Sequence, residues 1–340
     1  MPKRITLKHI ANTFGVSIAT VSKALSDSYE ISTATKEKIV AYAREHNYKS
    51  KSIDLSVLHK KTKTIGVIIP NIMNSFFAKV FVGIEEKATQ NGYHLISCIS
   101  NESLEKEVKT LELLKSDSLD GIIISLAEET QLQQQYAHLT NAINEGVPVV
   151  MFDRVADEID CDKVIVNDLE GAFHATKHLI TTGCKRVALI SVIDNLSVGK
   201  LRVEGYKKAL QEFAIPLEEK LIVRIGKNED FDTALKIILA DKNIDGLLCL
   251  EESAAVNALR IVKHMNYSVP KDMSIACFTN GKLLQHLTPS ISAISQHGKH
   301  IGETAATMLI DRIENEEQHN PFITKVVKTS LIERESTRSH

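Results

Sequence analysis

The stretch that decides the fold is ITLKHIANTFGVSIATVSKALS, residues 5–26. From Leu7 to Phe14 apolar residues recur at i, i+3, i+4 and i+7, which is the spacing of one apolar stripe on a helix. GVS at 15–17 then interrupts the pattern, with a glycine suited to a left-handed turn and a serine suited to cap a second helix. The outer face of that second helix is small, hydroxylated or cationic and comprises Ile18, Ala19, Ser22, Lys23 and Ser26. This pattern predicts a helix-turn-helix, although the spacing alone also fits a small helical hairpin on a larger body.

The charge is distributed unevenly along the 340 residues, a length that predicts about two or three domains. Residues 1–64 contain 12 Lys and Arg against 5 Asp and Glu, whereas the remainder contains 29 against 38. The net charges are therefore +7 and −9. A basic segment in front of an acidic body is typical of a nucleic-acid-binding module attached to another domain.

The five cysteines form no C-x-x-C pair and their number is odd, which predicts reduced thiols. The opening residues MPKRIT lack the apolar core of an export signal, and no uncharged apolar run reaches the roughly 18 residues of a membrane span. We therefore expect a cytoplasmic protein with no membrane partner.

The sequence pattern changes twice after the helix-turn-helix. A third helix is predicted from Ser32 to near Asn47, and a basic linker follows at 49–63. From Thr64 onward short apolar runs alternate with segments of helical period, such as 75–91 and 104–116, and this alternation predicts parallel sheets with helical crossovers. The pattern restarts after VPVVMFD, and DGIII at 120–124 is echoed by DGLLC at 245–249. We expect two doubly wound α/β subdomains with a cleft between them.

The helix-turn-helix sequence resembles, nearly position by position, the DNA-binding headpiece of the lactose-repressor (LacI/GalR) family of bacterial transcription regulators. The resemblance continues through YEISTATKEKIVAYAREHNY and TKTIGVIIPNIMNSFFAKVFVGIEEKATQNGYHL to SLIERES, so it covers essentially the whole chain. It implies an all-α helix-turn-helix headpiece with a hinge helix, followed by a two-lobed α/β effector domain of the periplasmic-binding-protein type. The implied bounds are headpiece 1–48, hinge 49–63 and effector and dimerisation domain 64–340, with lobe 1 at 64–160 and 292–320 and lobe 2 at 161–291 and 321–335.

For DNA, the resemblance places Ile18 and Ala19 at the two specificity positions and Lys23 where most members have arginine, so these three residues are expected to read bases. The residues expected to contact phosphate are Thr6, Ser17, Thr20, Ser22 and Ser26. Val57 and Leu58 fall where the hinge of the family enters the minor groove. A single headpiece binds weakly, and the chain ends without a leucine-heptad tail, so we expect a homodimer on a palindromic operator of double-stranded DNA.

For the effector, the resemblance implies a small molecule, a sugar or sugar derivative, held at the carboxyl ends of strands. The predicted contacts are Asn74, Phe76, Ser125, Asp153, Arg154, Arg202, Glu252, Asn280 and Gln296. Several positions also suit a purely structural role: Phe77, beside them, can be core, Glu252 can be a helix-terminal carboxylate, and Arg202 can be a salt bridge between lobes. Thr279 stands where an aspartate often grips a neutral hexose, and Arg154 and Arg202 are cationic. An acidic or oligomeric sugar is therefore an equal alternative.

No enzyme motif for phosphate cradling, nucleophilic catalysis or zinc hydrolysis occurs, and no catalytic residue, cofactor or metal is predicted. His174 and His178 share a helix face, and we interpret them as solvated rather than as zinc ligands. The predicted function is a ligand-controlled transcriptional regulator, a repressor of carbohydrate-utilisation genes. The alternatives are a sugar-binding module of transport or chemotaxis with a helical appendage and a nucleotide-dependent α/β enzyme.

Overall fold

The computed structural model describes residues 7–25, 28, 31–45, 62–116, 119–226, 228–279, 281–315 and 320–339. It divides into two compact units, Met1–Thr62 and Lys63–His340. Among the described residues, no helix combines the length and the apolar character that crossing a bilayer requires.

The described residues of the first unit form three helices, α1 (Leu7–Phe14), α2 (Ile18–Leu25) and α3 (Thr33–Glu45). Gly15 joins α1 to α2 with a φ of 62°, the left-handed turn that the sequence predicts. The ring of Phe14 packs edge-on against Tyr42 at 5.3 Å. The apolar stripes meet in one small core, made of Ile10, Ala11, Val21, Ala24, Ile39 and Ala43. The predicted helix-turn-helix is confirmed.

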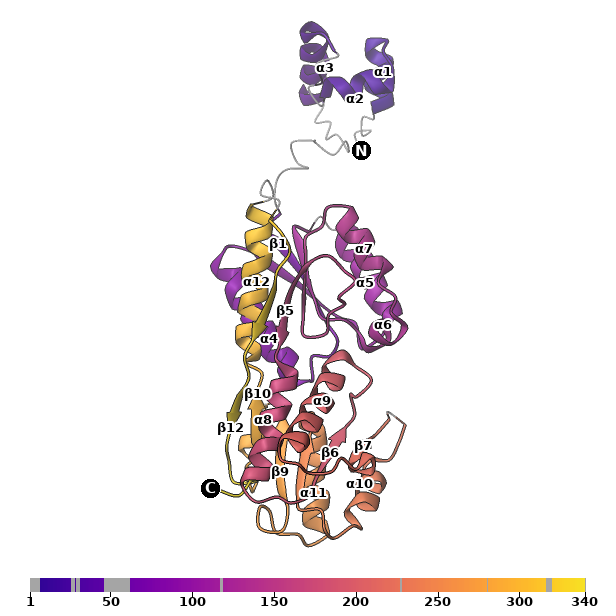
Figure 1. Ribbon diagram of the computed structural model, residues 1–340. Helices are drawn as coiled ribbons and strands as arrows, with labels where there is room; N and C mark the ends of the chain where they lie inside the picture. The colour runs from indigo at the N-terminus through magenta and orange to yellow at the C-terminus, as the bar shows by residue number, and fades with distance from the viewer. Residues whose placement is uncertain are drawn as a thin grey trace. The chain divides into compact units, whose positions relative to one another are not determined.

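The first lobe of the second unit is a parallel six-stranded sheet in the order β11-β5-β4-β3-β1-β2. Its strands are β1 (Thr64–Ile69), β2 (His94–Ile99), β3 (Gly121–Ile124), β4 (Val149–Phe152), β5 (Asp162–Val166) and β11 (Thr324–Val327). α4 (Ser75–Gln90) and α12 (Gly298–Glu314) cover one face, while α5 (Leu104–Ser116), α6 (Glu128–Gln133) and α7 (Ala137–Asn144) lie on the other (Figure 1). The central strands are continuous apolar runs because both faces are covered.

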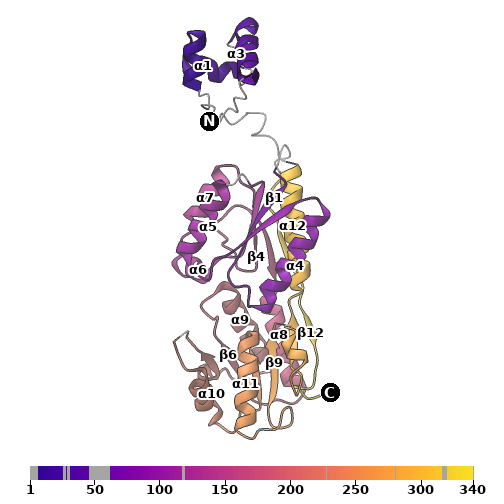
Figure 2. The same ribbon diagram turned by 180° about the vertical axis from the view of Figure 1, so that it is seen from behind.

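The second lobe repeats this arrangement, with a sheet in the order β12-β10-β9-β8-β6-β7. Its strands are β6 (Val187–Ser191), β7 (Ile222–Arg224), β8 (Gly246–Cys249), β9 (Ser274–Phe278), β10 (Ser292–Ser295) and β12 (Ser330–Ile332), of which β12 is antiparallel. α8 (Asp168–Thr181) and α9 (Ser197–Glu212) pack on one face, and α10 (Phe231–Leu239) and α11 (Glu252–His264) on the other (Figure 2). DGIII and DGLLC form β3 and β8, which occupy equivalent places in the two sheets.

The chain crosses between lobes three times, at residues 167, 296–297 and 328–329. The predicted lobe bounds are wrong for three strands. β5, placed at the start of lobe 2, pairs with β4 in the first sheet, and β11, placed in lobe 2, pairs with β5. β10, placed in lobe 1, pairs with β9 in the second sheet. The apolar pattern identifies each strand but carries no information about its hydrogen-bonding neighbour, which decides the lobe.

Candidate DNA and effector sites

The second helix of the helix-turn-helix, α2, is stabilised by its buried face and by its N-cap. Val21 and Ala24 are buried, and the backbone N–H of Thr20 donates to Ser17 Oγ at 3.0 Å. Ser17 therefore caps the helix, and its hydroxyl also lies 2.8 Å from the hydroxyl of Thr20, so the two predicted phosphate contacts interact with each other. Lys23 is exposed near the end of α2.

The remaining predicted DNA contacts are not all described. Ile18, Ala19 and Ser22 lie on α2, of which the structure describes the backbone at these positions but not the side chains. Thr6, Ser26, Val57 and Leu58 lie outside the described residues. Their roles stay predictions.

In the second unit, polar side chains cluster at the carboxyl ends of the strands. Ser125 follows β3, and Asp153 and Arg154 follow β4, where Arg154 O accepts from Leu126 N at 3.1 Å. All three side chains are buried, and Ser125 Oγ, Asp153 Oδ1 and Arg154 Nε have no hydrogen-bond partner among the described residues. Buried polar atoms are normally paired, so unpaired ones beside each other indicate a site that a ligand completes.

Asp153 is in an unusual electrostatic environment. Its backbone is left-handed, with φ at 58°, and burial raises the pKa of its carboxyl to about 6. The negative charge of Asp168 raises this pKa further, whereas Arg154 and Arg202 lower it. The carboxyl is therefore an acceptor whose charge is poorly stabilised until a donor reaches it.

Both predicted cleft arginines are paired with carboxylates. Arg154 Nη1 donates to Glu102 Oε2 at 2.5 Å, and its guanidinium lies over the ring of Phe77 at 5.4 Å. Arg202 Nε donates to Asp168 Oδ1 at 2.7 Å, and both side chains are buried. Burial raises the pKa of Asp168, and Arg202 opposes that shift. These pairings remove the reason to expect an acidic sugar at Arg154 and Arg202.

Asp168 and Glu102 are not among the residues predicted from the sequence. Asp168 follows β5 by two residues, so it occupies the same strand-end position as Asp153 and Arg154. That position is the signal by which it could have been found. Arg202 also donates to Leu250 O at 2.8 Å and lies 3.9 Å from the ring centroid of Phe278, so it is fixed within the second lobe.

The other predicted effector residues divide between local roles and contacts across the lobes. Asn74 caps α4, accepting from Phe76 N at 2.9 Å, and Phe76 is buried against Phe77 at 5.3 Å. Phe77 belongs to the core of the first lobe, as predicted. Glu252, from the second lobe, accepts a hydrogen bond from the Ser75 hydroxyl of the first.

Gln296 lies on the second crossing segment and is 4% exposed. Its Oε1 accepts from Thr279 Oγ1 at 2.7 Å. Asn280, the neighbour of Thr279, lies outside the described residues. A second contact between lobes is Gln131 Nε2 to Ser197 Oγ at 2.9 Å.

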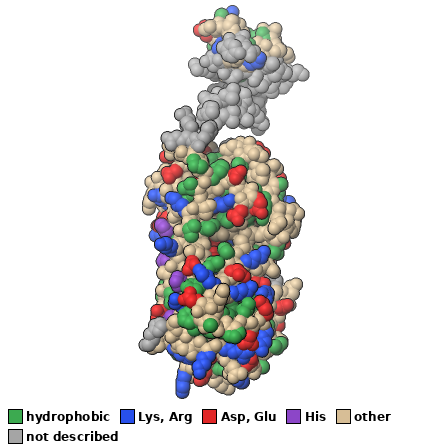
Figure 3. Space-filling model, in the orientation of Figure 1, with side chains coloured by type: hydrophobic (Ala, Val, Ile, Leu, Met, Phe, Trp, Pro, Cys, Tyr) green, Lys and Arg blue, Asp and Glu red, His purple; other side chains and the backbone are tan. Residues whose placement is uncertain are grey.

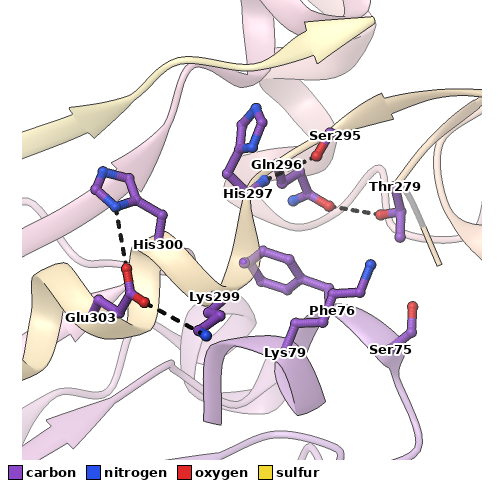
Figure 4. A pocket seen from close by; sticks show the side chains of 11 residues that line it. Ser75, Phe76, Lys79, Thr279, Ser295, Gln296, His297, Lys299, His300 and Glu303 are labelled. Atoms are coloured by element: carbon purple, nitrogen blue, oxygen red, sulfur yellow. Dashed lines mark hydrogen bonds and ion pairs between the residues drawn. The ribbon is translucent and has the colours of Figure 1, made fainter. Parts of the chain in front are cut away.

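A pocket of about 340 Å³ lies beside Gln296 (Figure 4). It is lined from both lobes, by the first turn of α4, by Thr279, and by the crossing segment that leads into α12. Residues predicted separately, Phe76 and Gln296, thus line one cavity.

The histidine pair of α8 does not form a metal site. His174 is exposed, but His178 is buried and its Nε2 lies 2.9 Å from Thr337 Oγ1, so the prediction that both are solvated is wrong for His178. Within the described residues, no group of three His, Cys, Asp or Glu side chains is placed to hold a metal ion.

Comparisons with known proteins agree with this architecture. Residues 6–51 match the model of bacterial regulatory proteins of the lacI family, and residues 176–337 match that of the periplasmic binding protein-like domain. The HTH-type transcriptional regulator RegA of Clostridium saccharobutylicum is 30% identical over 335 residues, which cover 98% of this chain and 99% of that protein. The ribose operon repressor of Haemophilus influenzae is 29% identical, with 98% and 99% covered.

One solved structure is a LacI transcriptional regulator from Alkaliphilus metalliredigens complexed with D-xylulofuranose. It is 28% identical, covers 82% of this chain and 100% of that one, and superposes with a TM-score of 0.69. The family model, the full-length relatives and the two-lobed fold agree. This chain belongs to the LacI family of DNA-binding transcriptional regulators.

Proposed function

We propose that this regulator represses genes for the use of a carbohydrate, and that a sugar bound between its lobes releases it from its operator. The observation that carries the proposal is the pair of unpartnered buried atoms, Asp153 Oδ1 and Arg154 Nε, beside Ser125 Oγ. A sugar hydroxyl both donates and accepts, so adjacent hydroxyls match an acceptor and a donor on neighbouring residues. The relatives support this chemistry, since one is named for a ribose operon and another holds D-xylulofuranose.

The regulation follows from the positions of these residues. Asp153 and Arg154 belong to the first lobe, whereas Asp168 and Arg202 belong to the second. A ligand that contacts both pairs stabilises one angle between the lobes more than others, and that difference in affinity is what shifts the population.

Operator binding is proposed to require a homodimer. β2 is an edge strand of the first sheet, and Ile96 and Ile99 on it and Val82 on α4 are exposed apolar side chains. An unpaired strand edge beside exposed apolar residues suits pairing with a second copy. We place the dimer on a palindromic operator in the cytoplasm, with Ile18, Ala19 and Lys23 reading bases.

The sugar hypothesis is tested by screening carbohydrates for a thermal shift of the full-length protein, then repeating a gel-shift assay with each hit. The duplex is one that the protein itself selects from a random library. We expect at least one sugar to raise the melting temperature and weaken operator binding. If no sugar changes operator affinity, the proposal is wrong.

Base reading by Lys23 is tested with Lys23→Ala. A base contact contributes about 1–3 kcal/mol of discrimination, so we expect the selected operator to lose roughly tenfold or more in affinity while an unrelated duplex loses less. Lys38→Ala, at an exposed position of α3, is the matched control. Equal losses on both duplexes would show that Lys23 contacts only phosphate.

A further inference from the structure

The second unit begins at Lys63, whose backbone has an unusual conformation. Lys63 directly precedes β1 and is the last residue of the basic linker at 49–63. Its φ is 53°, which lies in the left-handed region that residues other than glycine seldom occupy. A side chain remains in that region only where the contacts around it enforce the conformation. The contacts of Lys63 therefore indicate what its position serves.

The backbone of Lys63 is hydrogen-bonded on both sides. Its N–H donates to Asp120 Oδ2 at 2.8 Å, and its carbonyl oxygen accepts from the N–H of His94 at 2.7 Å. Asp120 directly precedes β3 and His94 begins β2, and these two strands flank β1 in the sheet. The direction in which the chain enters the first lobe is therefore fixed by both neighbours of β1.

The side chain of Lys63 is held by a third element. Its Nζ donates to Glu314 Oε1 at 2.7 Å and lies 4.2 Å from the ring centroid of Tyr93, which is buried. The Tyr93 hydroxyl donates to the same Glu314 oxygen at 3.4 Å. The hydrogen bond to Glu314 raises the pKa of Lys63, and burial opposes that shift. The ion pair is nearly half exposed, and exposed pairs add little stability, so these contacts position Lys63 more than they stabilise the fold.

Glu314 connects Lys63 to the far end of a long helix. It is the last residue of α12, which has 17 residues and begins at Gly298, directly after the second crossing segment. At 1.5 Å per residue such a helix is about 25 Å long. Figure 3 shows acidic side chains on the surface at the end of the first lobe where α12 ends in Figure 1. One continuous helix thus extends from a crossing segment to the residue that receives the linker.

We propose that Lys63 is a positioning residue for operator recognition, which fixes how the linker leaves the first lobe and so restricts a dimer to one spacing of operator half-sites. A dimer binds two half-sites at once only where its geometry matches their separation. A linker that leaves in a fixed direction narrows the range of separations that the second headpiece can reach. The inference rests on the proposed function for the homodimer on a palindrome, and not for the sugar.

The experiment compares two duplexes in a gel-shift assay with the full-length protein: the palindrome that the protein selects from a random library, and the same palindrome with one base pair inserted at its centre. Wild type should lose about 100-fold in affinity on insertion, because simultaneous engagement of both half-sites is lost. Lys63→Met and Glu314→Gln should lose only about tenfold on insertion, and Lys63→Arg, which keeps the cation, should behave as wild type. Lys109→Met breaks an exposed ion pair with Glu105 on α5 and is the matched control.

Lys63→Gly separates positioning from stability. Glycine adopts a positive φ without strain, so the midpoint of urea unfolding should stay the same or rise while the spacing preference is lost.

Three outcomes would overturn the inference. If Lys63→Met and Glu314→Gln lose as much affinity on insertion as wild type, Lys63 does not set the spacing, and the palindromic dimer stands. If Lys63→Met weakens binding to both duplexes equally and Glu314→Gln changes neither, Lys63 is only a phosphate contact. If wild type itself binds both duplexes equally, the palindromic dimer of the proposed function fails together with the inference.

Discussion

Replacing Asp153 with asparagine should stabilise the ligand-free protein at neutral pH. The carboxyl has a pKa of about 6 in the folded protein against an ordinary value of 3.8, and this difference corresponds to about 3 kcal/mol. Because the folded-state pKa is the higher one, the folded protein binds more protons than the unfolded chain between these values. Stability is therefore lost as the pH rises from about 4 to about 6, and asparagine, which does not titrate, avoids that loss.

The measurement is urea unfolding of wild type and Asp153→Asn at pH 4.5, 6.0 and 7.5, followed by far-ultraviolet circular dichroism because the chain contains no tryptophan. The free energy of unfolding of the variant should exceed that of wild type by an amount that grows with pH. This difference should reach at most about 3 kcal/mol, because the buried amide N–H groups of the new asparagine also lack partners and reduce the gain. Asp160→Asn removes an exposed carboxylate of the same segment and serves as the control.

If the difference in free energy of unfolding between the variant and wild type were constant across this pH range, or if it fell as the pH rises, the reasoning would be refuted. The same variant should bind the effector more weakly, because a sugar hydroxyl donates better to a carboxylate than to an amide oxygen. Greater stability together with weaker effector binding would identify Asp153 as a residue retained for recognition.

Two further substitutions test the packing around the site. Arg202→Ala leaves the charge of Asp168 buried and unpaired, so the free energy of unfolding should fall by about 3–5 kcal/mol. The double variant that also carries Asp168→Asn should regain most of this loss. If urea unfolding showed the single Arg202→Ala variant to be as stable as wild type, the pairing would be contradicted. Gly302→Ala places a Cβ where it overlaps the carbonyl oxygen of Val80, so it should destabilise by at least about 1–3 kcal/mol. Gly226→Ala, whose nearest neighbour would be 3.7 Å away, should change the unfolding midpoint little, and equal effects of the two alanines would argue against close contact of α4 and α12.

Local features of this chain were predictable because their causes are local. The helix over 75–91 follows from its apolar spacing, and it forms as α4 with Asn74 as its cap. The turn at Gly15 follows from the need for a positive φ. The repeated strand pattern also predicts two similar sheets, and β3 and β8 occupy matching places in them.

Features that depend on distant partners were not predictable. Arg154 and Arg202 appear in the sequence as two cations near a cleft, but their carboxylates lie 52 and 34 residues away along the chain. Neutralisation by Glu102 and Asp168 therefore becomes visible only in the folded protein. The same limit applies to β5 and β11, whose sheet is decided by a neighbour that periodicity does not reveal.

The three crossing segments contain only one or two residues each. Crossing segments this short prevent the two lobes from sliding past each other. Their relative motion is therefore restricted to hinge bending about the line on which the three crossing segments lie. Gln296 lies on the second crossing segment, and Asp168 directly follows the first. A small molecule bound at these segments would contact the hinge itself. A small change in the angle between the lobes at the hinge would then move the far ends of both lobes by a larger distance.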